Sequence, residues 1–228
     1  EAGMVPEGLN NYLALLGWSI APDRDVFSMR EMVGAFDISD VNPNPARFDH
    51  KKAVAINAEH IRLLDGADFR DRLVPFLHRD GLVSADSFGA LAPREQEVLS
   101  EAAPLVQTRM QVLGEASGML GFLFVADSGL EVDAKAVAKL KDNAGEVLDE
   151  AIAFVEGLGA DEFATDRLEA GLRQRIVDGM GIKPRLAFGP LRVAVTGRQV
   201  SPPLFESMEI LGRESSLARL RALREALA

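Results

Sequence analysis

The residue types best suited to chemistry lie together in "LRVAVTGRQVSPPLFESMEILG", residues 191–212, where a glycine and a Ser-Pro-Pro turn stand among arginines of an acidic chain. Ser201 is placed to cap a helix whose first position is Pro202. Because the prolines at positions 202 and 203 lack amide hydrogens, the helix start offers few donors, those of Leu204 and the residue after it. A narrow, partly apolar site of this kind suits the edge of a nucleobase, with Arg192 as a forked donor. A capped helix–turn–helix that only packs against its neighbours is the alternative explanation.

No other set of residues predicts catalysis or metal binding. The chain has no cysteine, which excludes disulfides, thiolate zinc sites and a cysteine nucleophile. Its histidines, His50, His60 and His78, lack the spacing of a metal-binding helix motif. Gly179 and Gly181 follow a predicted helix rather than a strand, so they mark a helix exit rather than a dinucleotide-binding loop. These absences favour a binding protein over a self-sufficient enzyme.

Charge is distributed unevenly along the sequence. The whole chain has a formal net charge of -10, which by itself argues against nucleic acid because phosphate binding uses Lys and Arg. Residues 127–162 contain ten acidic residues against three lysines, a net of -7, whereas residues 167–198 contain seven basic residues against two acidic ones, a net of +5. The asymmetry suggests an anionic partner at one end of the molecule, and a solvated helix face is the simpler alternative.

Apolar residues have helical spacing over most of the chain. In residues 166–180 they recur every four positions, with Thr165 placed as N-cap and Gly181 followed by Pro184 as the stop. An apolar stripe opposite acidic residues predicts a second continuous helix over residues 134–158.

Prolines and glycines predict further helix boundaries. Pro104 is expected at a helix start or kink, since it cannot donate a backbone hydrogen bond. A helix is expected to open at Pro190 and to end at Gly197 in the left-handed conformation.

The first 65 residues are richer in turn signals, such as "APDRD" and "DVNPNPARFDH". Helices fit residues 6–17, 28–36 and 49–63, with at most a short strand pair between them. The predicted fold is therefore mainly α, a small mixed unit followed by two α-helical bundle subdomains. No apolar run approaches the roughly 18 residues of a spanning helix, and the start lacks the basic region of a signal peptide, so we expect a cytoplasmic protein that does not bind membranes.

Three stretches of the sequence carry a family signature: "EAGMVPEGLNNYLALLGWS", "FDISDVNPNPARFDHKKAVAINAEHIRLL" and "LRVAVTGRQVSPPLFESMEILGRE". The first and last resemble bacterial glutamyl-tRNA synthetases, in the stretch after the catalytic signature loop and in the C-terminal anticodon-reading segment. The second resembles the stem-contact region of that family. It matches the family pattern at Phe48, Asp49, Lys52, Asn57 and Ile61. The resemblance covers essentially the whole chain.

The resemblance implies which residues bind RNA. The family reads the anticodon with two arginines and a short loop before a helix, which correspond here to Arg109 in "PLVQTRMQVL", Arg192, Ser201, Pro202 and Leu204. The residues corresponding to a tRNA-stem contact are Lys51, Lys52 and Asn57, where an ordinary exposed lysine pair is the alternative.

The resemblance also implies an organisation and partners. Residues 1–66 would form the stem-contact region, residues 67–132 the first anticodon-binding helical subdomain and residues 133–228 the second. Neither ATP-binding signature of the class I synthetases occurs in the chain, so we expect no cofactor in it, with ATP and magnesium bound by an upstream catalytic domain. The expected partners are tRNA-Glu, with tRNA-Gln left open, and that catalytic domain of the same synthetase, and the chain is expected to be a monomer. An acidic helical module that binds proteins and ignores RNA is the alternative.

Overall fold

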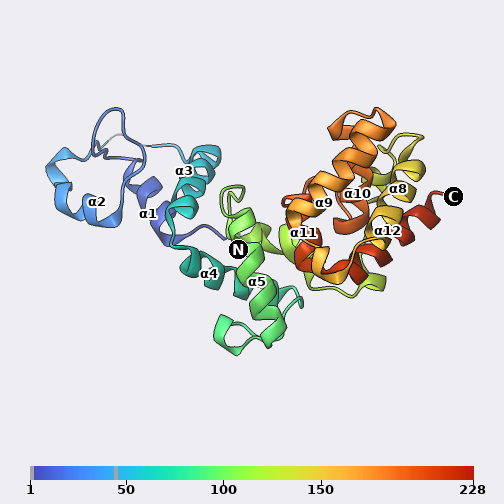
Figure 1. The fold of residues 1–228 in the computed structure, drawn as a ribbon. Helices are drawn as coiled ribbons and strands as arrows, with labels where there is room; N and C mark the ends of the chain where they lie inside the picture. Colours follow the sequence, from blue (N-terminus) through green and yellow to red (C-terminus); the bar gives the residue numbers. More distant parts are fainter. Residues whose placement is uncertain (1–2, 44–45) are drawn as a thin grey trace. The chain divides into compact units, whose positions relative to one another are not determined.

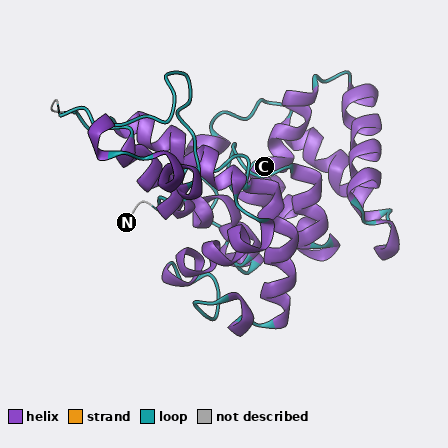
Figure 2. Ribbon diagram, turned by 90° about the vertical axis from the view of Figure 1, so that its left-hand side faces the viewer, coloured by secondary structure: helices purple, strands orange, loops and turns teal. Residues whose placement is uncertain are grey.

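The computed structural model describes residues 3–43 and 46–228, and this part of the chain consists of helices joined by turns and loops (Figure 1, Figure 2). The chain divides into two compact units, residues 1–118 and residues 119–228, called unit 1 and unit 2 below. The mainly α fold expected from the sequence is confirmed. Among the described residues, none of the helices combines the length and the apolar character that a membrane-spanning helix needs.

The described residues of unit 1 contain five longer helices, whose starts follow from local chemistry. Pro6 needs no amide hydrogen at the first position of α1, and the side chains of Ser28 and Asp49 accept hydrogen bonds from the first turns of α2 and α3. The bounds are α1 Pro6–Ala14, α2 Met29–Ala35, α3 His50–Leu63, α4 Gly66–Arg79 and α5 Pro93–Val106. The three helices predicted in the first 65 residues are thus confirmed.

Helix α1 lies against α3, and α4 lies against α5. Gly8 permits the close approach of α1, because a Cβ atom at this position would lie 2.8 Å from the Cα of Asn57. The large side chains that are fully buried in these helices include Tyr12, Ile61, Phe69, Leu73, Leu77 and Leu99. Burial of these side chains supplies the main stabilising free energy of unit 1.

Two details of unit 1 refine the sequence prediction. The sequence allowed at most a short strand pair between α1 and α3, and the described residues of this region contain one antiparallel bridge, between Ala21 and Arg24, which close a turn. The described part of unit 1 is therefore mainly helical. Pro104 lies in the last turn of α5, which starts at Pro93. Residues 44 and 45, within the proline-containing stretch predicted to interrupt helix, lie outside the described residues.

Unit 2 is built around one hydrophobic core formed mainly by its last five helices. The helix bounds are α6 Ala116–Leu120, which crosses the sequence boundary between the units, α7 Ala134–Val137, α8 Ala144–Glu156, α9 Thr165–Leu172, α10 Pro184–Thr196, α11 Leu204–Leu211 and α12 Arg213–Ala226. Fully buried core residues include Leu148, Leu172, Leu191, Met208 and Leu220. Helix α8 packs against α10 and α12.

The helix predicted over residues 134–158 is wrong in one respect, because it is broken into α7 and α8. The break spans residues 138–143 and includes Asp142 and Asn143, residue types that favour turns over helix interiors. Gly157 follows α8 as predicted. The predicted helix start at Pro190 is also wrong: α10 begins at Pro184, where a missing amide hydrogen is harmless, and Pro190 lies inside it.

The helix predicted over residues 166–180 contains a π-helical segment, Arg173–Asp178, after α9. Its N-cap is Ala164 rather than Thr165, whose N–H donates to the Glu209 carboxylate at 2.8 Å. In an α-helix, four residues turn the chain by about 400°, so apolar residues spaced by four drift about 40° per turn. The wider π-helical turn offsets this drift, and the apolar residues at positions 168, 172 and 176 all stay fully buried.

Candidate nucleic-acid interface

Arg192 and the loop before α11 form the centre of the candidate site. Arg192 belongs to α10, and its Nη1 donates hydrogen bonds to Ser201 Oγ at 2.5 Å and to the Pro202 carbonyl oxygen at 2.7 Å. The Ser201 hydroxyl donates to the same carbonyl at 2.9 Å. Because the donors of a guanidinium have fixed directions, these contacts hold Arg192 in one orientation against the loop.

The start of α11 differs from the sequence prediction. The helix begins at Leu204 with Pro203 as N-cap, so Ser201 is not the cap and Pro202 is not the first helical residue. Ser201 binds Arg192 instead, since a hydrogen bond with a charged donor is stronger than a neutral one. Pro202 is buried, and Leu204 is only 3% exposed within the core of unit 2. The side chain of Leu204 therefore supports the loop from the core.

Gly197 fixes the other end of the loop. It ends α10 in the left-handed conformation, with φ +73° as predicted. Its carbonyl oxygen accepts a hydrogen bond from the Asp133 N–H at 2.9 Å. A Cβ atom at position 197 would lie 2.3 Å from the Glu131 carbonyl oxygen, so only glycine allows the two backbones to come this close.

Arg219 on α12 holds the C-terminal end of α10 from the inside of unit 2. Its side chain is 1% exposed and pairs with Asp127 at 2.7 Å. Its Nη1 donates to the carbonyl oxygens of Val195 and Phe122, both at 2.9 Å. A buried guanidinium that satisfies several carbonyls orders the segments that carry them, and here one of these segments leads directly into the loop.

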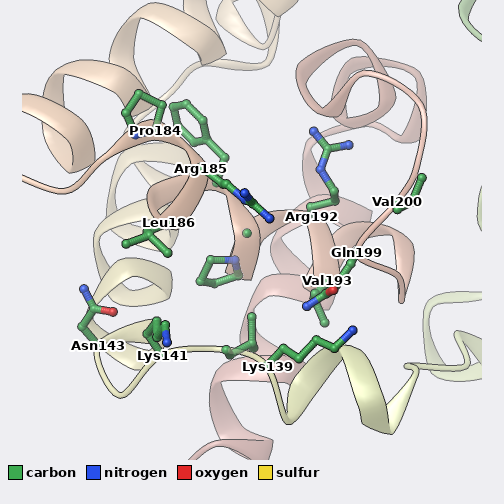
Figure 3. A pocket seen from close by; sticks show the side chains of 14 residues that line it. Lys139, Lys141, Asn143, Pro184, Arg185, Leu186, Arg192, Val193, Gln199 and Val200 are labelled. Atoms are coloured by element: carbon green, nitrogen blue, oxygen red, sulfur yellow. The ribbon is translucent and has the colours of Figure 1, made fainter.

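A pocket of about 730 Å³ opens beside Arg192 (Figure 3). Arg185 and Arg192 of α10 lie on one side of it in this view, and Lys139 and Lys141, from the turns between α7 and α8, lie on the other. The lining contains no Asp or Glu. The remaining lining residues are Leu140, Asn143, Pro184, Leu186, Phe188, Gly189, Pro190, Val193, Gln199 and Val200. We call this pocket the cationic groove.

Sequence reasoning missed the three cations that share the groove with Arg192. Lys139 and Lys141 lie in the segment that the charge count classed as acidic, and Arg185 was counted only as part of the basic segment. A signal was present in the sequence, because the predicted helix exit at Gly181 and Pro184 places Arg185 at the start of a new helix.

Arg109 is exposed in the turn that follows α5. The turn is anchored on α3, since the Gln107 side chain donates to the carbonyl oxygens of Ile61 at 3.0 Å and Leu64 at 2.9 Å. Arg109 therefore belongs to unit 1, whereas Arg192 belongs to unit 2.

The three residues predicted to contact the tRNA stem have different environments on α3. Lys51 is exposed and lines a shallow groove of about 510 Å³ along this helix. Lys52 is exposed and ion-paired with Asp25 at 3.0 Å. Asn57 is fully buried: its Oδ1 accepts from the Val5 N–H at 2.7 Å, and its Nδ2 donates to the Gln111 carbonyl at 2.6 Å. Both ends of the Asn57 amide thus hold unit 1 together.

A charged network lies between α1, α3 and α4. Both oxygens of Glu7 accept hydrogen bonds from Arg72 at 2.8 Å, and this pairing lowers the pKa of Glu7. His60 Nε2 is hydrogen-bonded to Asn11 Oδ1 at 2.8 Å, and burial lowers the pKa of His60 below its ordinary value.

In the described part of the chain, no group of three or more His, Cys, Asp or Glu side chains is placed to hold a metal ion.

Comparison with known proteins assigns this arrangement to a family. The sequence profile of the anticodon binding domain matches residues 68–224, more than half of the chain. The chain belongs to the anticodon-binding domain family. The matched range includes Arg109, Arg192 and the loop with Ser201, whereas Lys51, Lys52 and Asn57 precede it.

Relatives of this anticodon-binding domain are named glutamate–tRNA ligases. The chain is 59% identical over 227 residues to the protein of Bifidobacterium adolescentis, and 60% identical over 228 residues to that of Kocuria rhizophila. All of the chain is covered, but only 45% and 44% of these relatives, so it spans less than half of their length and corresponds to their C-terminal part. The resemblance to this group of proteins found in the sequence is confirmed.

A solved structure supports the fold of the anticodon-binding domain. The glutamate tRNA ligase of Elizabethkingia meningosepticum, crystallised in complex with its amino acid, matches 99% of this chain and 42% of its own with a TM-score of 0.80. The sequence identity is 23%, so the comparison establishes a shared helical architecture.

Proposed function

We propose that this chain binds the anticodon arm of tRNA-Glu and presents the tRNA to the catalytic part of a glutamate–tRNA ligase. The observation that carries the proposal is the hydrogen bonding of Arg192 to Ser201 and Pro202 in a domain of the anticodon-binding family. A planar fork fixed in one orientation can distinguish the hydrogen-bonding edges of bases. Leu204 supports the loop from the core and offers its backbone N–H at the first position of α11.

Arg109 is proposed as a second base contact, because it is exposed on a turn that α3 holds in place. In this proposal residues 67–132 and 133–228 form two anticodon-binding subdomains, and residues 1–66 form the stem-contact region. Lys51 and Lys52 would bind phosphates of the stem. Asn57 has the structural role that its burial indicates.

The proposed protein partner is the catalytic domain of the same synthetase, which would bind ATP and magnesium, so that this chain needs no cofactor of its own. Exposed apolar residues support such a partner. Most of the large apolar side chains exposed in the described residues lie in the first part of unit 1: Leu9, Leu13, Met29, Val33, Phe36, Ile38 and Phe48. Exposed apolar side chains that gather in one part of a protein often mark a contact with another protein. The chain would act as a monomer that binds one tRNA, and tRNA-Gln is the second tRNA to be tested.

The test is a titration of the chain with tRNA-Glu transcripts at low salt. We expect the affinity to fall when the anticodon bases are exchanged. The variant Arg192→Lys keeps the charge and removes the fork, so it should lose about 1–3 kcal/mol of anticodon discrimination with little change in salt dependence. Equal affinity for cognate and exchanged anticodons would refute the proposal and favour a protein-interaction module. Incubation with ATP, glutamate and tRNA should yield no charged product until a catalytic domain is added.

A further inference from the structure

The cationic groove contains positive charge that the proposed base contacts do not use. We propose that it binds the phosphodiester backbone of the RNA strand adjoining the base held at Arg192, through Lys139, Lys141 and Arg185. This inference rests on the proposed function, and it adds a contact that is independent of base sequence.

The lining of the groove favours an anion. Lys139, Lys141, Arg185 and Arg192 line one pocket, and no Asp or Glu lines it. A concave surface that carries charge of a single sign concentrates its field and attracts ligands of the opposite sign. In a chain whose net charge is -10, such a surface is a local exception that the overall charge does not predict.

The groove lysines and Arg185 also differ in their partners from most arginines of unit 2. The arginines of α9, of the π-helical segment and of α12 are all ion-paired with carboxylates at 3.9 Å or less. Lys139, Lys141 and Arg185 are exposed, and none of them has an ion pair with a carboxylate of the described residues. An incoming phosphate would therefore not have to displace a carboxylate from these side chains.

The position and the apolar wall of the groove select a polynucleotide over a small anion. Arg192 lines the groove and also binds the loop at Ser201, so a strand with one base at that loop can place its neighbouring nucleotide over the groove. Leu186, Pro190 and Val193 line the same pocket. An apolar wall can support the flat face of a base or a ribose without reading its edge, and a volume of about 730 Å³ is large enough for a nucleotide.

The experiment compares three forms of the chain: the unaltered chain, the triple variant Lys139→Gln/Lys141→Gln/Arg185→Gln, and a matched control. The control variant, Arg167→Gln/Arg175→Gln/Arg221→Gln, removes the same charge from ion-paired positions outside the groove. Binding is measured from 50 to 200 mM salt with tRNA-Glu, with a transcript of exchanged anticodon, and with a single-stranded oligouridylate. Thermal unfolding followed by circular dichroism checks that each variant is folded.

The affinity for RNA falls as salt rises, and each phosphate contact on a single strand makes the fall of log affinity with log salt steeper by about 0.7. Loss of three contacts should make this slope shallower by about 2. The fourfold rise in salt should therefore weaken RNA binding by the unaltered chain about 16-fold more than binding by the groove variant. The groove variant should lose affinity equally for both transcripts and keep the ratio between them, and the control should retain the original slope.

The two proposals fail in different ways. Equal affinity of the unaltered chain for both transcripts would refute anticodon reading, while the slopes measured with oligouridylate would still decide the role of the groove. A groove variant whose slopes equal those of the unaltered chain overturns the inference, as does a control variant whose slope falls by the same amount. A groove variant that loses anticodon discrimination and keeps its slope would show that these cations contact bases instead of phosphates.

Discussion

Replacing Gly197 with alanine should displace the loop that carries Ser201. The residue has φ +73°, a left-handed conformation that costs an amino acid with a Cβ about 1–2 kcal/mol. The new Cβ would lie 2.3 Å from the Glu131 carbonyl oxygen, a backbone atom that cannot rotate away. If the segment at residues 131–133 moves to relieve this overlap, the hydrogen bond from Asp133 to Gly197 is lost, which removes about 1 kcal/mol. The free energy of unfolding should therefore fall by about 2–3 kcal/mol.

Two other glycines of unit 2 separate strain from steric overlap. Gly181 has φ +66°, and no atom lies within 4 Å of a Cβ built on it, so Gly181→Ala should lose only the 1–2 kcal/mol of backbone strain. Gly189 lies inside α10 with ordinary φ and with no atom within 4 Å of its Cβ position. Gly189→Ala should stabilise the helix by up to about 1 kcal/mol.

The assay is urea unfolding followed by far-UV circular dichroism, with Trp18 fluorescence recorded in parallel. Trp18 is the only tryptophan of the chain and lies in unit 1, so its signal reports unit 1, whereas circular dichroism reports the helices of both units. The urea concentration at the midpoint of unfolding of unit 2 should be highest for Gly189→Ala, lower for Gly181→Ala and lowest for Gly197→Ala. If Gly197→Ala costs no more than Gly181→Ala, the contact with Glu131 does not constrain the loop and the reasoning is refuted.

Two further predictions concern buried polar groups. Arg219→Met should lower the free energy of unfolding by about 3–5 kcal/mol in the same assay, because it leaves buried carbonyls and Asp127 without their donor; a loss below about 1 kcal/mol would contradict this role. His60 has a pKa lowered by burial, which outweighs the raising effect of the Glu7 charge, so the unfolded chain binds a proton at higher pH than the folded chain does. Stability should therefore fall as the pH drops from 7 through the ordinary histidine pKa of about 6.5. His60→Gln should flatten this part of the profile in urea unfolding at a series of pH values, and an unchanged slope between pH 7 and 5 would oppose the assignment.

Helix starts that depend on neighbouring residues could be predicted from the sequence. Pro6, Ser28 and Asp49 mark the beginnings of α1, α2 and α3 as expected, because capping acts over only three or four residues. The start of α11 could not be predicted in this way. The Ser201 hydroxyl had a second possible partner in Arg192, nine residues earlier, and the packing of α10 beside the loop brings the two together.

The interior of the helices shows the same limit. The spacing of apolar residues predicted a helix after Thr165, but not the π-helical segment that keeps its later turns buried. The break between α7 and α8 likewise had only weak local signals, because apolar periodicity continues across it. Tertiary packing selects between such alternatives, since local propensities differ by only about 1 kcal/mol per residue.

The sequence by itself determined the helical fold and the family, and it predicted the loop around Arg192 as a candidate site, because these depend on periodicity, on capping and on short motifs. Only the tertiary structure decided which charges share a surface. Lys139 and Lys141 come from a segment with a net charge of -7, yet they line the same groove as Arg185. In the segment of net charge +5, Arg173 and Arg175 are paired with carboxylates. Electrostatic energy depends on distances in space, and a count of charges along the chain does not contain those distances.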